Sequence, residues 1–173
     1  MSGIISDNLS KSSGLIKAAG GGGKVNQVVQ TVDTTIRSAT SSSFQSTSIS
    51  VTITPSASTS KIMLDFNGYM GFSTGLRAFF QVYKNVGGAG IGAIAIPGSL
   101  DGMMVVGEND TATSSCVAVQ LHYLDSPSTT SEIVYTMYWN PNGGGAHNVY
   151  LGEMKGGANN TCPTFFTATE ILA

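Results

Sequence analysis

Residues 114–139 alternate apolar and polar side chains with a period of two, which is the repeat of a β-strand. Two runs show this pattern, and a polar segment at residues 125–131 separates them. One face of the first run carries Val117, Val119, Leu121 and Tyr123, and one face of the second carries Ile133, Tyr135, Met137 and Trp139. The pattern predicts two long strands paired as a hairpin. Because the reverse faces also carry apolar or aromatic residues, we expect the hairpin to lie in the centre of a sheet.

Other short apolar runs follow one another between turn residues. They lie at residues 25–32, 49–53, 62–66, 78–82, 93–96, 103–106, 149–154 and 165–172. The Ser/Thr-rich segment 34–48 is predicted to be a long surface loop. Many short strands without alternating helices indicate an all-β fold, an antiparallel β-sandwich or a jelly-roll-like body.

Residues 1–23 differ in character from the rest of the chain. Scattered apolar side chains precede a run of four glycines, Gly20 to Gly23, which predicts a flexible joint. The apolar residues are Ile4, Ile5, Leu9, Leu15 and Ile16. We interpret residues 1–23 as an extended N-terminal arm that serves for attachment, and residues 24–173 as a single β-sandwich body. An unstructured tail is the alternative interpretation.

The composition favours a protein that contacts other protein subunits. Charged residues make up 10% of the 173 residues and the net charge is −2, whereas ordinary soluble domains contain about 25% charged residues. The chain therefore lacks the positive charge that would bind nucleic acid or anionic lipid. It also lacks an apolar run long enough to span a membrane, and its N-terminus has no secretory signal pattern.

The sequence predicts no cofactor and no metal site. The two histidines, His122 and His147, have no partner residues at the spacing of metal ligands. The two cysteines, Cys116 and Cys162, form no recognisable disulfide pattern, and we expect buried free thiols.

One motif resembles the nucleophile of a serine hydrolase. Residues 71–75 match G-x-S-x-G around Ser73, and Asp101 or Asp125 followed by His147 would supply the rest of a triad. That chemistry requires a helix directly after the serine, whereas residues 76–84 alternate like a strand. We therefore expect no enzyme activity and retain the hydrolase only as a remote alternative.

Aromatic residues gather in and beside the predicted hairpin. Tyr123, Tyr135, Tyr138 and Trp139 are expected to pack in the core or in a subunit interface. Stacking on a sugar is the alternative role of any ring that faces outward.

Several segments together resemble small virion proteins of marine and cyanobacterial tailed bacteriophages. These segments are residues 25–31, 49–55, 60–64, 78–84, 123–131 and 167–171, and the similarity extends from Val25 to the end of the chain. The resemblance implies a β-sandwich or jelly-roll module, typically a homotrimer, on the outer surface of the virion. Such modules occur as head decorations and in tail fibres.

The short chain favours the head, because it contains no repetitive shaft or heptad stalk. We therefore expect a trimeric capsid decoration (cement) protein whose arm contacts the major capsid protein. The alternative is a tail-fibre or receptor-binding module that contacts a host glycan through loops at residues 34–48 and 140–148.

Overall fold

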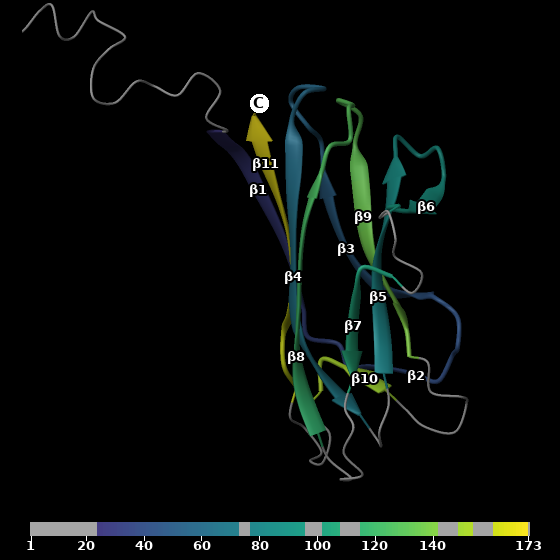
Figure 1. Cartoon of the computed structure of the whole chain (residues 1–173). Helices are drawn as coiled ribbons and strands as arrows, with labels where there is room; N and C mark the ends of the chain where they lie inside the picture. The colour runs from purple at the N-terminus through teal and green to yellow at the C-terminus, as the bar shows by residue number, and fades with distance from the viewer. Residues whose placement is uncertain are drawn as a thin grey trace, which may run out of the picture.

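A computed structural model describes residues 24–72, 77–95, 102–107, 115–141, 149–153 and 161–172. The described residues form two antiparallel β-sheets packed face to face, which confirms the predicted β-sandwich (Figure 1). The predicted arm, with Ile4, Ile5, Leu9, Leu15 and Ile16, lies outside the described residues.

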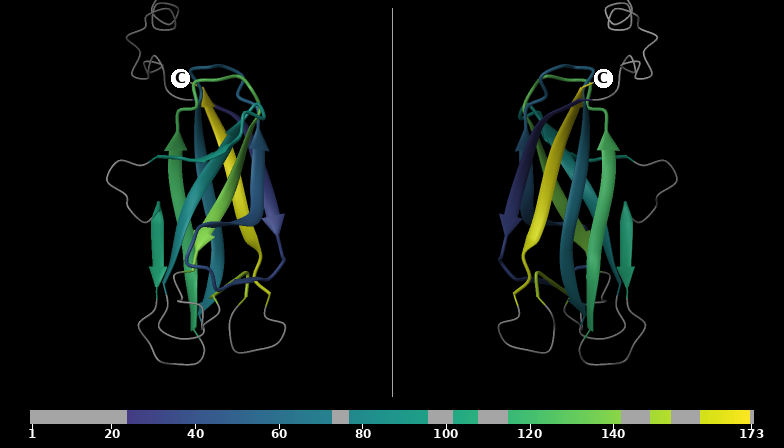
Figure 2. Two further views of the ribbon diagram at one scale, coloured as in Figure 1. Left: turned by 90° about the vertical axis from the view of Figure 1, so that its right-hand side faces the viewer. Right: turned by 90° about the vertical axis from the view of Figure 1, so that its left-hand side faces the viewer.

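Six of the described strands form the first sheet, which we call sheet A. They are β1 (Lys24–Asp33), β2 (Arg37–Ala39), β4 (Lys61–Phe72), β8 (Ser115–Asp125), β10 (Val149–Leu151) and β11 (Thr164–Leu172). Strand β4 is central: β8 pairs along one of its edges from Ile62 to Phe72. Strands β11 and β10 therefore share the other edge, one after the other. Strand β1 then pairs with β11, and β2 pairs with β10 (Figure 2).

The other five described strands form the second sheet, sheet B. They are β3 (Gln45–Ile53), β5 (Arg77–Val86), β6 (Ile91–Ala93), β7 (Met104–Gly107) and β9 (Ile133–Asn140). Strand β9 lies between β3 and β5, while β6 and β7 pair with the other edge of β5.

The core lies between the sheets and consists of the inward-facing half of each alternating strand. Phe66 of β4 is fully buried and contacts Phe80 of β5 and Phe166 of β11, with ring centroids 6.1 and 5.6 Å apart. Burying an apolar side chain of this size contributes about 1.5–3 kcal/mol. At the edge where β1 faces β3, Thr31 Oγ1 donates a hydrogen bond of 2.7 Å to the Ser50 carbonyl, so polar contacts also join the sheets.

The predicted hairpin is wrong, although both of its strands exist. The alternation is as expected, with Val119 and Leu121 of β8 and Ile133 and Tyr135 of β9 buried. Among the described residues, however, β8 pairs only with β4 and is an edge strand, whereas β9 lies in the centre of sheet B. Packed sheets are about 10 Å apart, and the segment 126–132 is long enough to cross from one to the other. Alternation identifies a strand and its buried face, but it does not identify the neighbouring strand.

The predicted loop at residues 34–48 is also wrong, since it contains β2 and the first part of β3. The β3–β9 pairing is irregular between Ser46 and Ser50, where β3 has two more residues than β9. Ser48 adopts a positive φ of 61° within this bulge. At this irregularity a side chain forms hydrogen bonds with backbone groups of both strands. Thr47 Oγ1 donates to the Met137 carbonyl at 2.7 Å and accepts from the Ile49 N–H at 3.2 Å. Serine and threonine can replace ladder hydrogen bonds in this way, so their abundance does not exclude a strand.

Candidate interaction surface

Exposed apolar side chains gather on the outer surface of sheet A. We call this surface the A face; it is formed by the outward side chains of β1, β11, β4 and β8. These four strands face the viewer in Figure 2, right. Six of the nine large apolar residues that are exposed in the described part of the chain lie on it, namely Val25, Val28, Val32, Tyr69, Leu124 and Phe165. The register aligns Val32, Phe165, Asn67 and Gln120 in one row across the four strands. Exposed apolar side chains from all four strands therefore share this surface, interleaved with polar ones, and make it a candidate interaction site.

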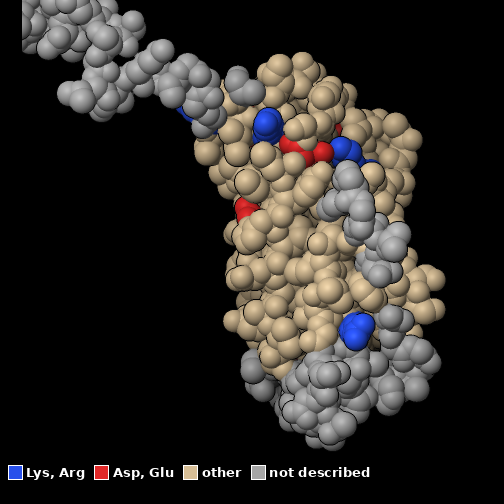
Figure 3. Space-filling view, viewed as in Figure 1, with Lys and Arg blue, Asp and Glu red and all other residues tan. Residues whose placement is uncertain are grey.

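The A face carries little charge. Lys61 and Asp65 lie two outward positions apart on β4, and Asp65 contacts His122 of the neighbouring strand. Charged residues are also sparse on the edge of the sandwich that Figure 3 shows. A nearly neutral surface does not repel another subunit of the same low-charge protein.

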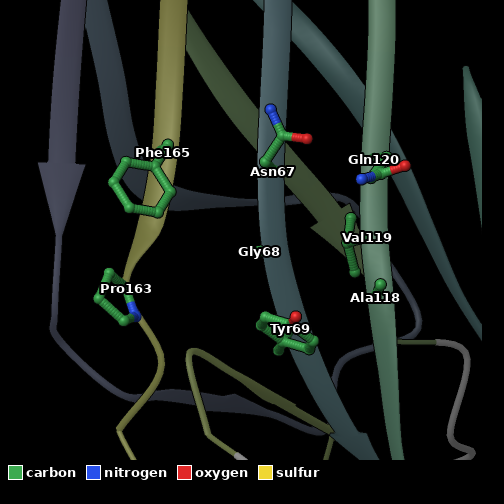
Figure 4. A pocket seen from close by; sticks show the side chains of 8 residues that line it. All are labelled: Asn67, Gly68, Tyr69, Ala118, Val119, Gln120, Pro163 and Phe165. Atoms are coloured by element: carbon green, nitrogen blue, oxygen red, sulfur yellow. The ribbon is translucent and has the colours of Figure 1, made fainter.

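A small pocket on the A face lies between Tyr69 and Phe165 (Figure 4). Phe165 and Pro163 line one side, and Ala118 and Gln120 line the other. Its volume is about 130 Å³, whereas sites for small organic ligands have about 300–1,000 Å³. The pocket is therefore large enough for one apolar side chain of a protein partner, but not for a typical cofactor.

The four aromatic residues from the sequence analysis occupy three different environments, and none lies on the A face. Tyr135 and Trp139 belong to the core. Tyr123 is half-buried against it, and burial together with the nearby Asp125 raises the pKa of its phenol. Tyr138 lies on the outer surface of sheet B and stacks on Tyr83, with ring centroids 3.9 Å apart.

A buried carboxylate, that of Glu170, ties three parts of the chain together. Its Oε2 accepts hydrogen bonds from the Asn26 and Gln27 side-chain amides, both at 2.8 Å. Its Oε1 accepts from the Ser56 N–H at 2.7 Å, from Ser56 Oγ at 2.8 Å and from Ser60 Oγ at 2.7 Å. Burial favours a raised pKa for the Glu170 carboxyl, but these hydrogen bonds outweigh it and lower the pKa to about 2. The cluster therefore fixes the start of β1, where the arm joins the body.

A second polar cluster joins the two sheets. Lys84 of β5 lies 2.9 Å from Asp125 Oδ2 at the end of β8, and the Tyr135 hydroxyl donates to the same oxygen at 2.8 Å. Burial and the adjacent Asp125 charge raise the pKa of the Tyr135 phenol, so Tyr135 stays protonated and remains a donor.

The described residues do not bring the candidate hydrolase triad together. Asp125 is engaged by Lys84 and Tyr135, while Ser73, Asp101 and His147 lie outside the described residues. The described residues contain no group of three His, Cys, Asp or Glu side chains that could hold a metal ion. They also contain no helix long and apolar enough to span a membrane.

The cysteines are free thiols, as expected, but they are only half-buried rather than buried. Partial burial, and then the proximity of Cys162, raise the pKa of the Cys116 thiol.

Sequence analysis did not identify the A face or the Glu170 cluster. The available signals were pairs of adjacent apolar residues, such as Val28-Val29 and Phe165-Phe166, which place one member of each pair on either face of a strand. A glutamate at an inward position of β11 was the corresponding signal for a buried polar cluster.

No protein-family model matches this chain, and a search of curated protein sequences finds no significant match.

Proposed function

We propose that this chain is a non-enzymatic structural subunit of a bacteriophage virion. In this proposal it is a capsid decoration protein that forms a homotrimer and attaches to the major capsid protein through residues 1–23. The bacteriophage assignment depends on the sequence resemblance at residues 25–31, 49–55 and 123–131. The proposal that copies of the chain assemble into a homotrimer depends on the A face.

The observation that carries the assembly part is the concentration of exposed apolar side chains on one sheet surface with little charge. Val28, Leu124 and Phe165 come from three different strands and share this surface. Neighbouring strands are about 4.8 Å apart and rise about 3.3 Å per residue, so four strands of about nine residues cover roughly 600 Å². The contacts of a trimer are heterologous, so the A face of each copy would meet a different surface of the next copy. The two surfaces together would bury about 1,200 Å², the lower limit of a standard stable interface. We therefore expect the A face to form the contact between copies, with additional contact from the arm.

Mass measurement in solution and capsid binding test the two parts separately. The full chain is expected to have the mass of a trimer at micromolar concentration and to bind particles assembled without it. A chain that begins at Lys24 is expected to keep its β-sheet circular dichroism and cooperative unfolding, because β1 and the Glu170 cluster remain. Its binding to capsids should be lost.

Two outcomes would contradict the proposal. A monomer at micromolar concentration would exclude the assembly part, and equal capsid binding with and without residues 1–23 would exclude attachment by the arm.

A tail-fibre or receptor-binding module is the second candidate. An open pocket of about 270 Å³, lined by residues of the segment 34–48 and by Trp139, favours it. Specific binding of the isolated body to host cells, rather than to capsids, would distinguish this function.

A further inference from the structure

Among the described strands, all sheet edges but one carry a feature that hinders pairing with a further strand. The edge strands are β1, β2 and β8 in sheet A and β3, β6 and β7 in sheet B. Strands β2, β6 and β7 have only three or four residues each. Strands β1 and β3 are longer, but register shifts interrupt the ladders that they form. Short and irregular edges are common means by which β-proteins avoid pairing with other chains.

Strand β8 is the exception. It has 11 residues and pairs with β4 along its whole length without a register shift. It contains neither proline nor lysine, two residues that commonly protect an edge. Figure 2, right, shows β8 along the side of sheet A opposite β1, and no described strand pairs with its other edge. Alternate residues of an antiparallel strand direct their N–H and C=O groups to that side, so this edge can accept a further strand.

The packing beneath β8 is also incomplete toward both ends of the strand. The inward residues Val119 and Leu121, near the middle, are buried. Val117 and Tyr123, on either side of them, also pack against the core but are only half-buried. A strand added at this edge would cover the exposed part of both side chains, which favours its binding.

We propose that the free edge of β8 pairs with β8 of a second copy of the chain, antiparallel and about a two-fold axis at Gln120. Such an axis, perpendicular to the sheet, makes every strand antiparallel to its own copy, so sheet A would continue into the partner. Gln120 is the middle residue of β8, so this register uses the whole strand. Residues directly opposite each other point to the same side of an antiparallel sheet, so the inner surfaces of the two copies are also aligned.

This register brings compatible side chains together. The pairs that it forms between copies are Val117 with Tyr123, Val119 with Leu121, Cys116 with Leu124, Ala118 with His122, and Gln120 with itself. β-Branched, aliphatic and aromatic residues in opposite positions stabilise antiparallel strands, whereas like charges in opposite positions destabilise them. No two like charges meet in these pairs. His122 is already held by Asp65 of its own copy.

The contact is expected to be weak in free solution. A strand of 11 residues is about 36 Å long, and an edge is little wider than one strand. The buried area therefore stays below the roughly 1,200 Å² of a standard stable interface. Such a contact forms when copies are held close together, because this raises their effective concentration. The inference does not depend on the capsid-decoration proposal or on the A face, since backbone groups of one edge carry it.

Disulfide trapping detects the contact even when it is weak. The full chain carries Cys116→Ser and Cys162→Ser to remove the native thiols, together with Gln120→Cys, and is treated with oxidised glutathione at high protein concentration. Opposite Cα atoms are about 4.5–5.5 Å apart in an antiparallel pair, within the range that a disulfide spans. Gln120→Cys is therefore expected to give a covalent dimer on a denaturing gel.

Ala118→Cys is the matched control, since residue 118 is also an exposed position of β8. In the proposed register it lies four residues, or about 13 Å, from residue 118 of the second copy. Its yield of covalent dimer should be at least tenfold lower. A mixture of Ala118→Cys and His122→Cys should form a mixed dimer, identified by its mass, because these positions are opposite each other. Circular dichroism checks that each variant keeps the β-sheet fold.

Four outcomes would overturn the proposal. Absence of a covalent dimer from Gln120→Cys would exclude this pairing, and absence of the mixed dimer would exclude the antiparallel register. Equal yields from Gln120→Cys and Ala118→Cys would indicate random collision, or a contact about an axis parallel to the strands. Linkage of Gln120→Cys to Leu9→Cys in a mixture of the two variants, in place of the self-linked dimer, would assign the edge to the N-terminal arm.

Discussion

Glu170 and Asp125 lie on opposite sides of Ile62 in sheet A, and the register places all three on the inner surface of the sheet. Both carboxylates are buried, but they are compensated differently. Neutral amide, hydroxyl and backbone donors surround Glu170, whereas Asp125 pairs with the Lys84 ammonium group and the Tyr135 hydroxyl. A buried charge without such partners would be strongly destabilising, so this end of the sandwich depends on both clusters.

Replacing Glu170 by glutamine is expected to destabilise the body by about 2–4 kcal/mol, because a side-chain NH₂ would face groups that are themselves donors. Urea unfolding at neutral pH measures this loss. Glu132→Gln, at an exposed glutamate, is the control and should change the free energy of unfolding little.

The stability of the body should also depend on pH through Glu170. The pKa of the Glu170 carboxyl is about 2 in the folded protein, against an ordinary value of 4.5 in the unfolded chain. The ionised carboxylate therefore stabilises the fold fully above about pH 4.5. This contribution is lost as the pH falls from about 4.5 toward 2. Unfolding measured across this range should show a weaker pH dependence for Glu170→Gln than for the wild type. Parallel curves would show that Glu170 is not the responsible group.

Tyr135→Phe removes the hydroxyl that donates to Asp125 and is expected to cost about 1.5–3 kcal/mol, the usual range for a hydrogen bond to a charged group. Because the pKa of the Tyr135 phenol is raised, an alkaline absorbance titration should show one tyrosine that ionises only when the protein unfolds. The variant should lack this late step. If the late step remains, another tyrosine is the protected one.

Gly102 is expected to tolerate no side chain. Its φ is 107°, and a Cβ atom there would lie 2.7 Å from the Phe80 carbonyl oxygen. We expect Gly102→Ala to lower the free energy of unfolding by about 1–3 kcal/mol. Gly92→Ala is the matched control, since an added Cβ at Gly92 meets no atom within 4 Å. Thermal unfolding of both variants compares them, and equal melting temperatures would contradict the steric argument.

A lysine on the A face should disrupt assembly without disrupting the fold. Val28 of β1 is 59% exposed and Ile91 of sheet B is 51% exposed, so Val28→Lys and Ile91→Lys alter similarly exposed positions on opposite sheets. Light scattering is expected to show a smaller mass for Val28→Lys and an unchanged mass for Ile91→Lys. The reverse result would move the subunit contact to sheet B.

The sequence alone determined where most strands lie and which of their faces is buried. Val119, Leu121, Ile133 and Tyr135 occupy the predicted inner positions, because the period of two is a property of each strand's own backbone. The β-sandwich class followed from the same local pattern.

Only the tertiary structure decided which strands are neighbours and which polar groups meet. Strands β8 and β9 are adjacent in the chain but pair in different sheets, and Glu170 bonds Asn26 across 144 positions of sequence. The A face and the pocket lined by Trp139 likewise combine residues from distant segments. The physical reason is that alternation is encoded within a strand, whereas pairing and polar contacts depend on the free energy of the whole packed arrangement.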